Sequence, residues 1–198
     1  MDKTLYIYTD ASLRKNELGM GVLFIDGEIE TRFQYRTTIS WLNKEYKSSV
    51  KVSIQYGETF AILKALENLP KTKFDKYVIF TDNTSVFDNL NSIKTKKDKV
   101  SKDKLLSGLT NKCLELMKDL NIEICWIKAH CGVFGNEVAD KIAKGAITNK
   151  IPCCNENRGH KWALDLLDFE FHMTFNLLHV PGLDHCLDQR FKETLNFK

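Results

Sequence analysis

Three short segments near the start of the chain have the apolar pattern of β-strands. Residues Leu5 to Thr9 alternate aliphatic and aromatic side chains, and two more apolar-rich runs, Met20–Ile25 and Ile29–Tyr35, are joined through Asp26-Gly27-Glu28. An Asp-Gly pair suits the positive φ angles of a tight hairpin turn. The pattern therefore predicts an antiparallel meander of three strands.

The next part of the chain has helical spacing. From Gln55 to Leu69, apolar residues recur at i, i+3, i+4 and i+7, and Pro70 ends the pattern. Tyr77–Thr81 has the composition of a fourth strand, and Ser85–Leu90 that of a brief helix. A helix is thus predicted to connect the meander to a strand parallel to its first strand.

The remaining elements repeat this order. Ser101 is a candidate N-cap for a helix with an apolar stripe from Leu105 to Leu120, and Ile122–Ile127 is a fifth strand. A last helix is predicted from about Glu137 to Lys144, closed by Gly145. The order predicts an α/β fold with a five-stranded mixed sheet, three strands antiparallel and then two parallel, flanked by helices.

The amino-acid composition indicates what class of protein this is. The 198 residues are 43% hydrophobic and 28% charged, which excludes a disordered, collagen-like or low-complexity chain. Residues 151–198 hold five Lys and Arg against seven Asp and Glu, so of the net charge of +3 they carry −2 and residues 1–150 carry +5. No apolar run approaches the roughly 20 residues of a membrane span, and six cysteines without a signal peptide favour reduced thiols. We expect an intracellular protein with no membrane partner.

The pattern changes near the C-terminus. Residues 162–178 contain both a strand-like alternation and a helical spacing, and the sequence does not choose between them. The cysteines and histidines of this region lack the paired spacing of a zinc site. We expect one domain over residues 1–147 and an extension of unknown role over residues 148–198.

Four carboxylates stand at the ends of predicted elements. Asp10 and Asp82 each follow an apolar strand, Glu58 lies in the first turn of one helix and Asp140 near the start of another. The carboxyl ends of neighbouring strands form a ligand-binding crevice in such sheets. Each acid alone fits a turn former or a helix N-terminal residue. As a set, they predict a site for two Mg²⁺ ions, with Mn²⁺ as a substitute, of the kind that performs phosphoryl displacement.

The chain resembles a known family. Over about residues 3–147 it is similar to type I ribonuclease H, and most closely to the domains attached to reverse transcriptases of retroelements. The similarity rests on four segments: Tyr8-Thr9-Asp10-Ala11-Ser12, Gly57-Glu58-Thr59-Phe60-Ala61-Ile62, Phe80-Thr81-Asp82-Asn83, and residues 126–140, which contain Gly135-Asn136-Glu137 and Ala139-Asp140.

The resemblance implies a function and a site. It implies a ribonuclease H-like catalytic domain over residues 1–147 that hydrolyses the RNA strand of RNA/DNA hybrids and leaves 5′-phosphate and 3′-hydroxyl ends. Asp10, Glu58, Asp82 and Asp140 are the implied metal ligands, and His130 the implied auxiliary general acid. A reverse transcriptase or a larger parent polyprotein is the implied protein partner.

The resemblance also implies contacts with nucleic acid. Gln55 takes the place of a family residue in the minor groove, although the Asn that often precedes it is Ile54 here, which cannot hydrogen-bond. Lys51 and Ser53 take the places of a phosphate pocket, and Ser12 follows the first acid.

One basic run has two interpretations. The segment from Ile93 to Lys104 has six Lys against two Asp, and its lysines, Lys96 and Lys97 among them, fit phosphate contacts or equally a solvated linker.

Two other functions remain open at this stage. The first is a catalytically weak or inactive hybrid-binding module derived from a retroelement polyprotein. The second is another nuclease or a transposase built on the same sheet.

Overall fold

A mixed β-sheet forms the centre of the molecule. The computed structural model describes residues 3–27, 29–49, 51, 53–95 and 103–148. Its sheet has five strands in the order β3-β2-β1-β4-β5. The strands are β1 (Thr4–Arg14), β2 (Glu17–Asp26), β3 (Ile29–Thr38), β4 (Lys76–Thr81) and β5 (Ile122–Trp126). The helices are α1 (Ile39–Glu45), α2 (Ile54–Glu67), α3 (Thr84–Thr95), α4 (Lys104–Met117) and α5 (Phe134–Thr148).

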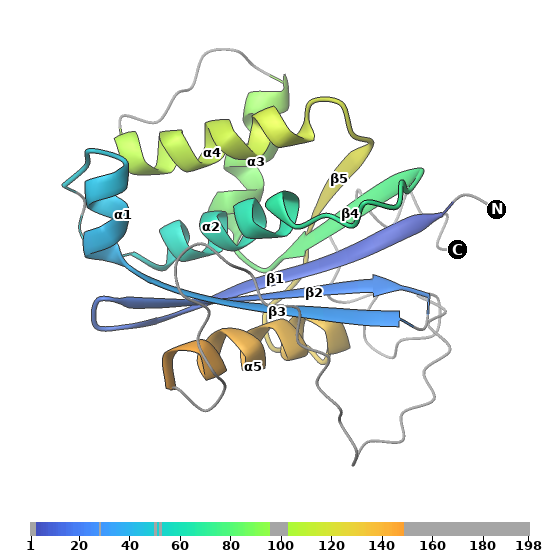
Figure 1. Cartoon of the computed structure of the whole chain (residues 1–198), viewed down its shortest axis with the longest axis horizontal. Coiled ribbons are helices and arrows are strands. Elements are labelled where there is room, and N and C mark those ends of the chain that lie inside the picture. The colour runs from blue at the N-terminus through green and yellow to red at the C-terminus, as the bar shows by residue number, and fades with distance from the viewer. Residues whose placement is uncertain (1–2, 28, 50, 52, 96–102, 149–198) are drawn as a thin grey trace.

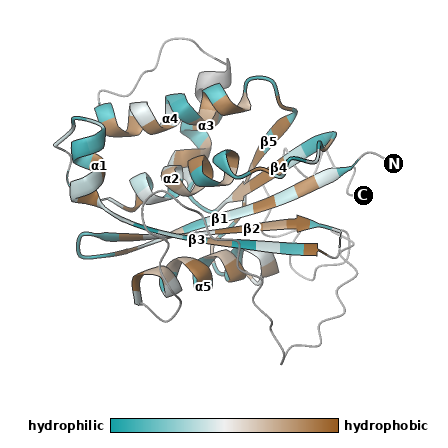
Figure 2. Cartoon of the chain, in the orientation of Figure 1, coloured by the Kyte–Doolittle hydropathy of each residue, from teal (hydrophilic) through white to brown (hydrophobic). Residues whose placement is uncertain are grey.

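The helices cover both faces of this sheet. Helices α2, α3 and α4 lie on one side and α5 on the other (Figure 1). The larger hydrophobic cluster, which includes Ile7, Leu63 and Leu109, fills the first interface. A smaller cluster with Tyr8, Phe80 and Val133 lies on the other side of the sheet. Strand β2 is mostly apolar, whereas β3 carries hydrophilic residues along much of its length (Figure 2).

Strand β1 has a different pairing length on its two sides. It pairs in parallel with β4 only from Thr4–Lys76 to Tyr8–Phe80. On the other side it continues antiparallel to β2 as far as Arg14–Glu17. Strands β4 and β5 are parallel. The predicted fold, with three antiparallel strands followed by two parallel ones, is therefore confirmed.

Several local predictions were wrong at element ends. Asp10 lies within β1 rather than after it, because the antiparallel partner β2 extends the strand. Glu58 is in the second turn of α2, which starts at Ile54, and Asp140 is in the second turn of α5. Gly145 does not close α5 but lies inside it. The N-cap of α4 is Asp103 rather than Ser101, and its Oδ1 accepts from two backbone N–H groups.

Helix α1 was not predicted from the sequence. It begins after Thr38, whose hydroxyl accepts a hydrogen bond from Trp41 N at 3.1 Å. Seven residues carry too little apolar periodicity to be distinguished from a polar loop.

The cysteine prediction holds in part. Cys113 and Cys125 are buried and are not part of a disulfide, as expected. The prediction is wrong for Cys131, which is disulfide-bonded.

Some predictions cannot be compared with the structure. Lys96, Lys97 and residues 149–198, with the proposed extension and the disfavoured zinc site, lie outside the described residues. In the part of the chain that is described, no helix has the length and apolar character needed to cross a bilayer.

Candidate active site

Three carboxylates from distant parts of the sequence meet at one end of the sheet. Asp10 comes from β1, Glu58 from α2, and Asp82 from the bend after β4. One oxygen atom of each lies within 4.8 Å of the others. Asp10 and Glu58 are only 6% and 3% exposed, whereas Asp82 is half-buried. We call these three residues the acidic cluster.

A glycine brings α2 close enough to contribute Glu58. A Cβ atom at Gly57 would lie 2.9 Å from Ala11 Cβ and 3.0 Å from Leu18 Cδ2. Because glycine has no Cβ, the helix can pack directly on β1 beside Asp10. Glu58, the next residue, is thereby placed against the strand.

Two glycines of β2 bring α5 onto the opposite face. A Cβ atom at Gly21 would collide with the backbone oxygen of Ala139 and lie 2.9 Å from Ala143 N, and one at Gly19 would collide with the backbone oxygen of Ala143. Gly21 is the register partner of Asp10. Asp140 on α5 is thus placed near Asp10.

Asp140 borders the acidic cluster without being one of the three clustered residues. Its Oδ2 accepts from Lys144 Nζ at 2.6 Å, one turn along α5. Its charge nevertheless raises the pKa of Asp10. The structure therefore brings the fourth predicted acid next to the other three and pairs it with a lysine.

One backbone amide links the two most buried acids. Ala11 N donates to Asp10 Oδ1 at 2.6 Å and to Glu58 Oε1 at 3.3 Å. The other oxygen of Glu58, Oε2, is buried and has no hydrogen-bond partner among the described residues. A buried carboxylate oxygen without a partner is costly, and either a proton shared with Asp10 or a bound cation would offset that cost.

The electrostatics of the acidic cluster also indicate that its negative charges are not compensated. Burial, and then the charges of Asp82 and Asp140, raise the pKa of Asp10 from 3.8 to about 7. Burial and the charges of Asp10 and Asp82 raise the pKa of Glu58 well above its ordinary range. Without a cation, the folded protein therefore retains protons in the acidic cluster that the unfolded chain releases.

This makes the cation-free protein less stable at neutral pH. Since Asp10 has a pKa of 3.8 when unfolded and about 7 when folded, its stabilising contribution is complete below pH 4 and is lost as the pH rises to 7. We expect a loss on the order of 4 kcal/mol, visible in calorimetry with EDTA as a melting temperature that falls by roughly 10 °C between pH 4.5 and 7.5.

The same experiment includes its control. The Asp10→Asn variant should lose less stability over this pH range, because its side chain does not titrate. A wild-type melting temperature that stays constant between pH 4.5 and 7.5, or an equal fall in both proteins, would contradict the assignment.

The residues present fit a divalent cation. All three side chains of the acidic cluster offer carboxylate oxygens, which Mg²⁺ and Mn²⁺ prefer. A bound cation would give the unpaired Glu58 Oε2 a partner. It would also lower the raised pKa values of Asp10 and Glu58. The chemistry of the donors does not distinguish between the two metals.

Two residues that sequence analysis left without a role hold Asp82. Trp126 Nε1 donates to the Asp82 backbone oxygen at 2.9 Å, and Asn136 Nδ2 donates to Asp82 Oδ2 at 3.0 Å. Both lie in segments that carry the family resemblance. Their roles depend on contacts between residues 44 and 54 positions apart, which no local pattern reports.

His130 lies on the loop between these two contacts. It is exposed, follows β5 and precedes α5, and has a φ of 51°. Trp126 and Asn136 bind Asp82 on either side of this loop. The loop that carries His130 is therefore attached to the acidic cluster at both of its ends.

Two of the predicted nucleic-acid contacts, Ser53 and Gln55, lie at the start of α2. Ser53 is the N-cap of α2, and its hydroxyl accepts from Gln55 N at 3.3 Å. Gln55 is half-buried, Lys51 is exposed, and Ser12 is half-buried on β1. Ile54 packs against the larger hydrophobic cluster instead of forming a polar contact.

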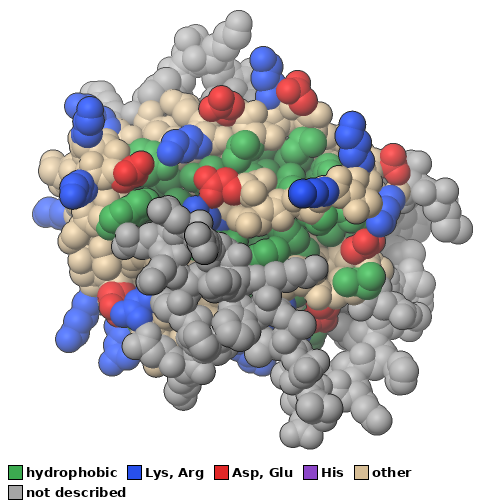
Figure 3. Space-filling view, viewed as in Figure 1, with side chains coloured by type: hydrophobic (Ala, Val, Ile, Leu, Met, Phe, Trp, Pro, Cys, Tyr) green, Lys and Arg blue, Asp and Glu red, His purple; other side chains and the backbone are tan. Residues whose placement is uncertain are grey.

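Charged side chains do not form a single basic patch on the described surface seen in Figure 3. There, Lys and Arg are spread around a band of apolar side chains, with Asp and Glu between them.

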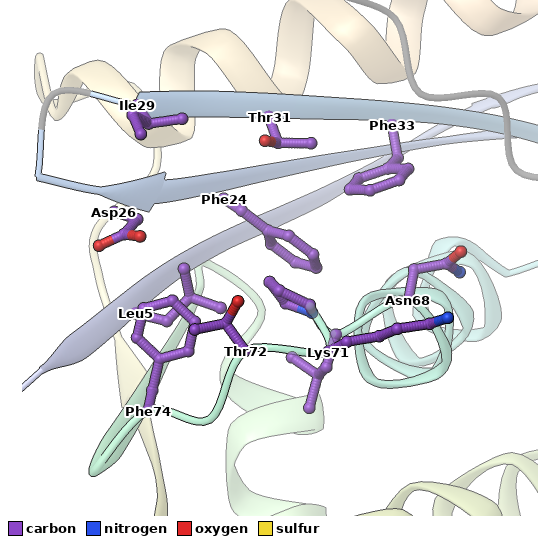
Figure 4. Close-up of a pocket in the computed structure, with 12 residues that line it drawn as sticks. Leu5, Phe24, Asp26, Ile29, Thr31, Phe33, Asn68, Lys71, Thr72 and Phe74 are labelled. Carbon is purple, nitrogen blue, oxygen red and sulfur yellow. The ribbon is translucent and has the colours of Figure 1, made fainter.

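A pocket occurs away from the acidic cluster. It has a volume of about 350 Å³ and includes residues at the start of β1, at the β2–β3 turn and after the end of α2 (Figure 4). Its walls are mainly apolar, with Leu5, Phe24, Phe33 and Phe74 among them. No member of the acidic cluster lines it.

Comparison with solved structures supports the fold. The chain is similar to RNase H1 from the halophilic archaeon Halobacterium salinarum NRC-1, with 19% identity, a TM-score of 0.54, and coverage of 74% of this chain and 98% of that one. It is also similar to LC11-RNase H1, isolated from compost by a metagenomic approach, with 18% identity, a TM-score of 0.55, and coverage of 75% and 98%. LC9-RNase H1, a type 1 RNase H with the type 2 active-site motif, matches with 15% identity, a TM-score of 0.57, and coverage of 76% and 75%.

Sequence comparison adds the family. A search of curated proteins finds no match. The family model described as RNase H matches residues 2–148, which include the whole acidic cluster and every described helix and strand. The chain therefore belongs to the RNase H family.

Proposed function

We propose that the protein hydrolyses the RNA strand of RNA/DNA hybrids and leaves 5′-phosphate and 3′-hydroxyl ends. The observation that carries this proposal is the acidic cluster, with a buried and unpaired Glu58 oxygen, in a chain of the RNase H family. Asp10, Glu58, Asp82 and Asp140 would hold two Mg²⁺ ions, or Mn²⁺ in their place. When bound, two such ions increase the acidity of an attacking water and neutralise the departing 3′ oxygen.

The chain itself prepares the site for these ligands. Ala11 N–H orients one oxygen each of Asp10 and Glu58, which leaves Glu58 Oε2 available for a cation. Packing of α2 on β1 at Gly57 removes water from the two acids. Lys144 would exchange its contact with Asp140 for solvent, since Lys144 is 58% exposed.

His130 is proposed as the auxiliary general acid. Its imidazole is exposed on a loop attached near Asp82 at both ends. Imidazole can both donate and accept a proton, which is the chemistry that proton transfer to a leaving group needs. In this role His130 donates a proton to the leaving 3′ oxygen of the RNA strand.

The hybrid is proposed to lie across the start of α2. Gln55 offers an amide to the minor groove, Lys51 and Ser53 face a phosphate of the DNA strand, and Ser12 contacts the RNA strand next to Asp10. The support is that Gln55 shares α2 with Glu58, that Ser12 shares β1 with Asp10, and that the side chains have suitable chemistry. The lysines of the 93–104 segment are proposed to add contacts with phosphates that do not depend on base sequence.

A cleavage assay with matched duplexes tests the proposal. We expect the full chain with Mg²⁺ to cut the RNA strand of a labelled hybrid and to leave duplex RNA and duplex DNA of the same sequence intact. Chelation with EDTA should stop the reaction. Binding of the hybrid without cleavage in either Mg²⁺ or Mn²⁺ would overturn the proposal and favour a binding module.

The origin and the domain limits are narrower proposals. The motifs around Asp10, Glu58, Asp82 and Asp140 support a catalytic domain over residues 1–147 of the kind attached to retroelement reverse transcriptases, followed by an extension over residues 148–198. Co-purification of the natural gene product with reverse transcriptase activity tests this origin, and absence of that activity would overturn it.

A further inference from the structure

Asp82 has less structural support than the other two acids of the cluster. Asp10 lies within β1 and Glu58 within α2, so regular backbone hydrogen bonds hold both. Asp82 lies one residue beyond the end of β4 and two residues before the start of α3. Its position therefore depends on contacts from other elements.

Two such contacts hold Asp82 from different directions. Thr81 and Trp126 are register partners at the ends of β4 and β5, and the Trp126 indole reaches one residue further to bind the Asp82 backbone oxygen at 2.9 Å. Asn136, from the first turn of α5, binds the carboxylate at 3.0 Å. One contact fixes the main chain of Asp82 and the other its side chain.

The Asn136 side chain does not favour folding stability by itself. It is 3% exposed, and its Oδ1 has no hydrogen-bond partner among the described residues. Only Nδ2 can donate to a carboxylate, so the amide orientation follows from the bond to Asp82. Because a buried polar atom without a partner is destabilising, a leucine of similar volume would suit the fold better. An unpaired buried group of this kind calls for a functional explanation.

We propose that Asn136 and Trp126 are positioning residues that fix the Asp82 carboxylate and so set the affinity of the acidic cluster for divalent cations. This inference rests on the proposed function, because it takes the acidic cluster as a cation site. Groups that orient a metal ligand through a hydrogen bond change metal affinity by about 10- to 100-fold. The same two contacts hold both ends of the loop that carries His130.

The test measures cation binding without substrate. Calorimetric titration of the full chain with Mn²⁺ should give a dissociation constant about 10- to 100-fold higher for Asn136→Leu than for wild type. The melting temperature of Asn136→Leu in EDTA should equal or exceed that of wild type, because the unpaired Oδ1 is gone. Trp126→Phe, which keeps an aromatic ring but loses the N–H donor, should bind Mn²⁺ about fivefold more weakly.

A second asparagine provides the matched control. Asn121 Nδ2 also makes one hydrogen bond, to the Asp75 oxygen at 2.9 Å, but it precedes β5 at the end opposite Trp126. Asn121→Ala should therefore bind Mn²⁺ as tightly as wild type does.

The possible outcomes separate this inference from the proposed function. If wild type binds Mn²⁺ and Asn136→Leu and Trp126→Phe bind it equally well, the positioning role is overturned and the proposed function stands. If Asn136→Leu weakens binding only together with a lower melting temperature in EDTA, and Trp126→Phe binds normally, the role is structural and the inference fails. If wild type binds no Mn²⁺, both proposals fail. If a higher Mg²⁺ concentration restores the cleavage rate of Asn136→Leu, that result would support the positioning role.

Discussion

Asp10→Asn should reduce the rate of hybrid cleavage by about 10³-fold or more while the fold persists. The asparagine carbonyl can still accept the hydrogen bond that Ala11 N donates to Asp10 Oδ1, so the local backbone keeps its partner. The side chain loses its negative charge, and with it the ability to bind a divalent cation as a carboxylate does. The measurement is the initial rate on a labelled hybrid at saturating Mg²⁺.

The stability of this variant shows whether lost activity reflects misfolding. Because burial and neighbouring charges raise the pKa of Asp10 to about 7, removing its charge should raise the melting temperature in EDTA at pH 7.5. Asp75→Asn is the matched control, since Asp75 also accepts a backbone hydrogen bond, from Lys3 N at 2.6 Å, but lies before β4 begins. Cleavage by Asp10→Asn within tenfold of wild type would contradict the site.

Gly21→Ala should have the largest effect on stability and should lower cleavage as well. The added Cβ would meet the backbone oxygen of Ala139 and lie 2.9 Å from Ala143 N. Strand β2 is held on both sides by β1 and β3, so α5 must move outward, and Asn136 and Asp140 move with it. We expect a loss on the order of 3 kcal/mol in the free energy of unfolding, measured by urea denaturation.

A second glycine separates close packing from backbone strain. Gly27 has a φ of +60° and nothing within 4 Å of an added Cβ. Gly27→Ala should therefore cost only about 1 kcal/mol, from the left-handed backbone conformation, and leave cleavage unchanged. If Gly21→Ala is as stable as Gly27→Ala, the close approach of α5 is not what the glycine permits.

Most elements could be predicted because their signals are local. The alternation in Leu5–Thr9, the Asp26-Gly27 turn and the apolar spacing before Pro70 each depend on neighbours within a few residues. Gly27 has the positive φ that the turn predicts. The ends of the elements were less predictable, because β2 extends β1 past Asp10 through pairing that no short window contains.

Local sequence patterns did not predict the residues that hold the acidic cluster in place. A strand with glycines at positions 19 and 21 does carry a signal, since two glycines on one face of a strand indicate close approach of another backbone. Asn136 and Trp126 carry no comparable signal, because their significance lies in hydrogen bonds to Asp82 across the fold.

The sequence by itself determined the order along the chain of the strands and of every helix except α1, and the chemical type of the site, since periodicity, turn residues and carboxylate side chains are properties of short segments. Only the tertiary structure decided that Asp10, Glu58 and Asp82 lie within 4.8 Å of one another, that Asp140 pairs with Lys144 beside them, and that the pKa of Asp10 rises to about 7. These properties depend on burial and on distances between segments far apart in the chain, which are set when α2 and α5 pack on the two faces of the sheet.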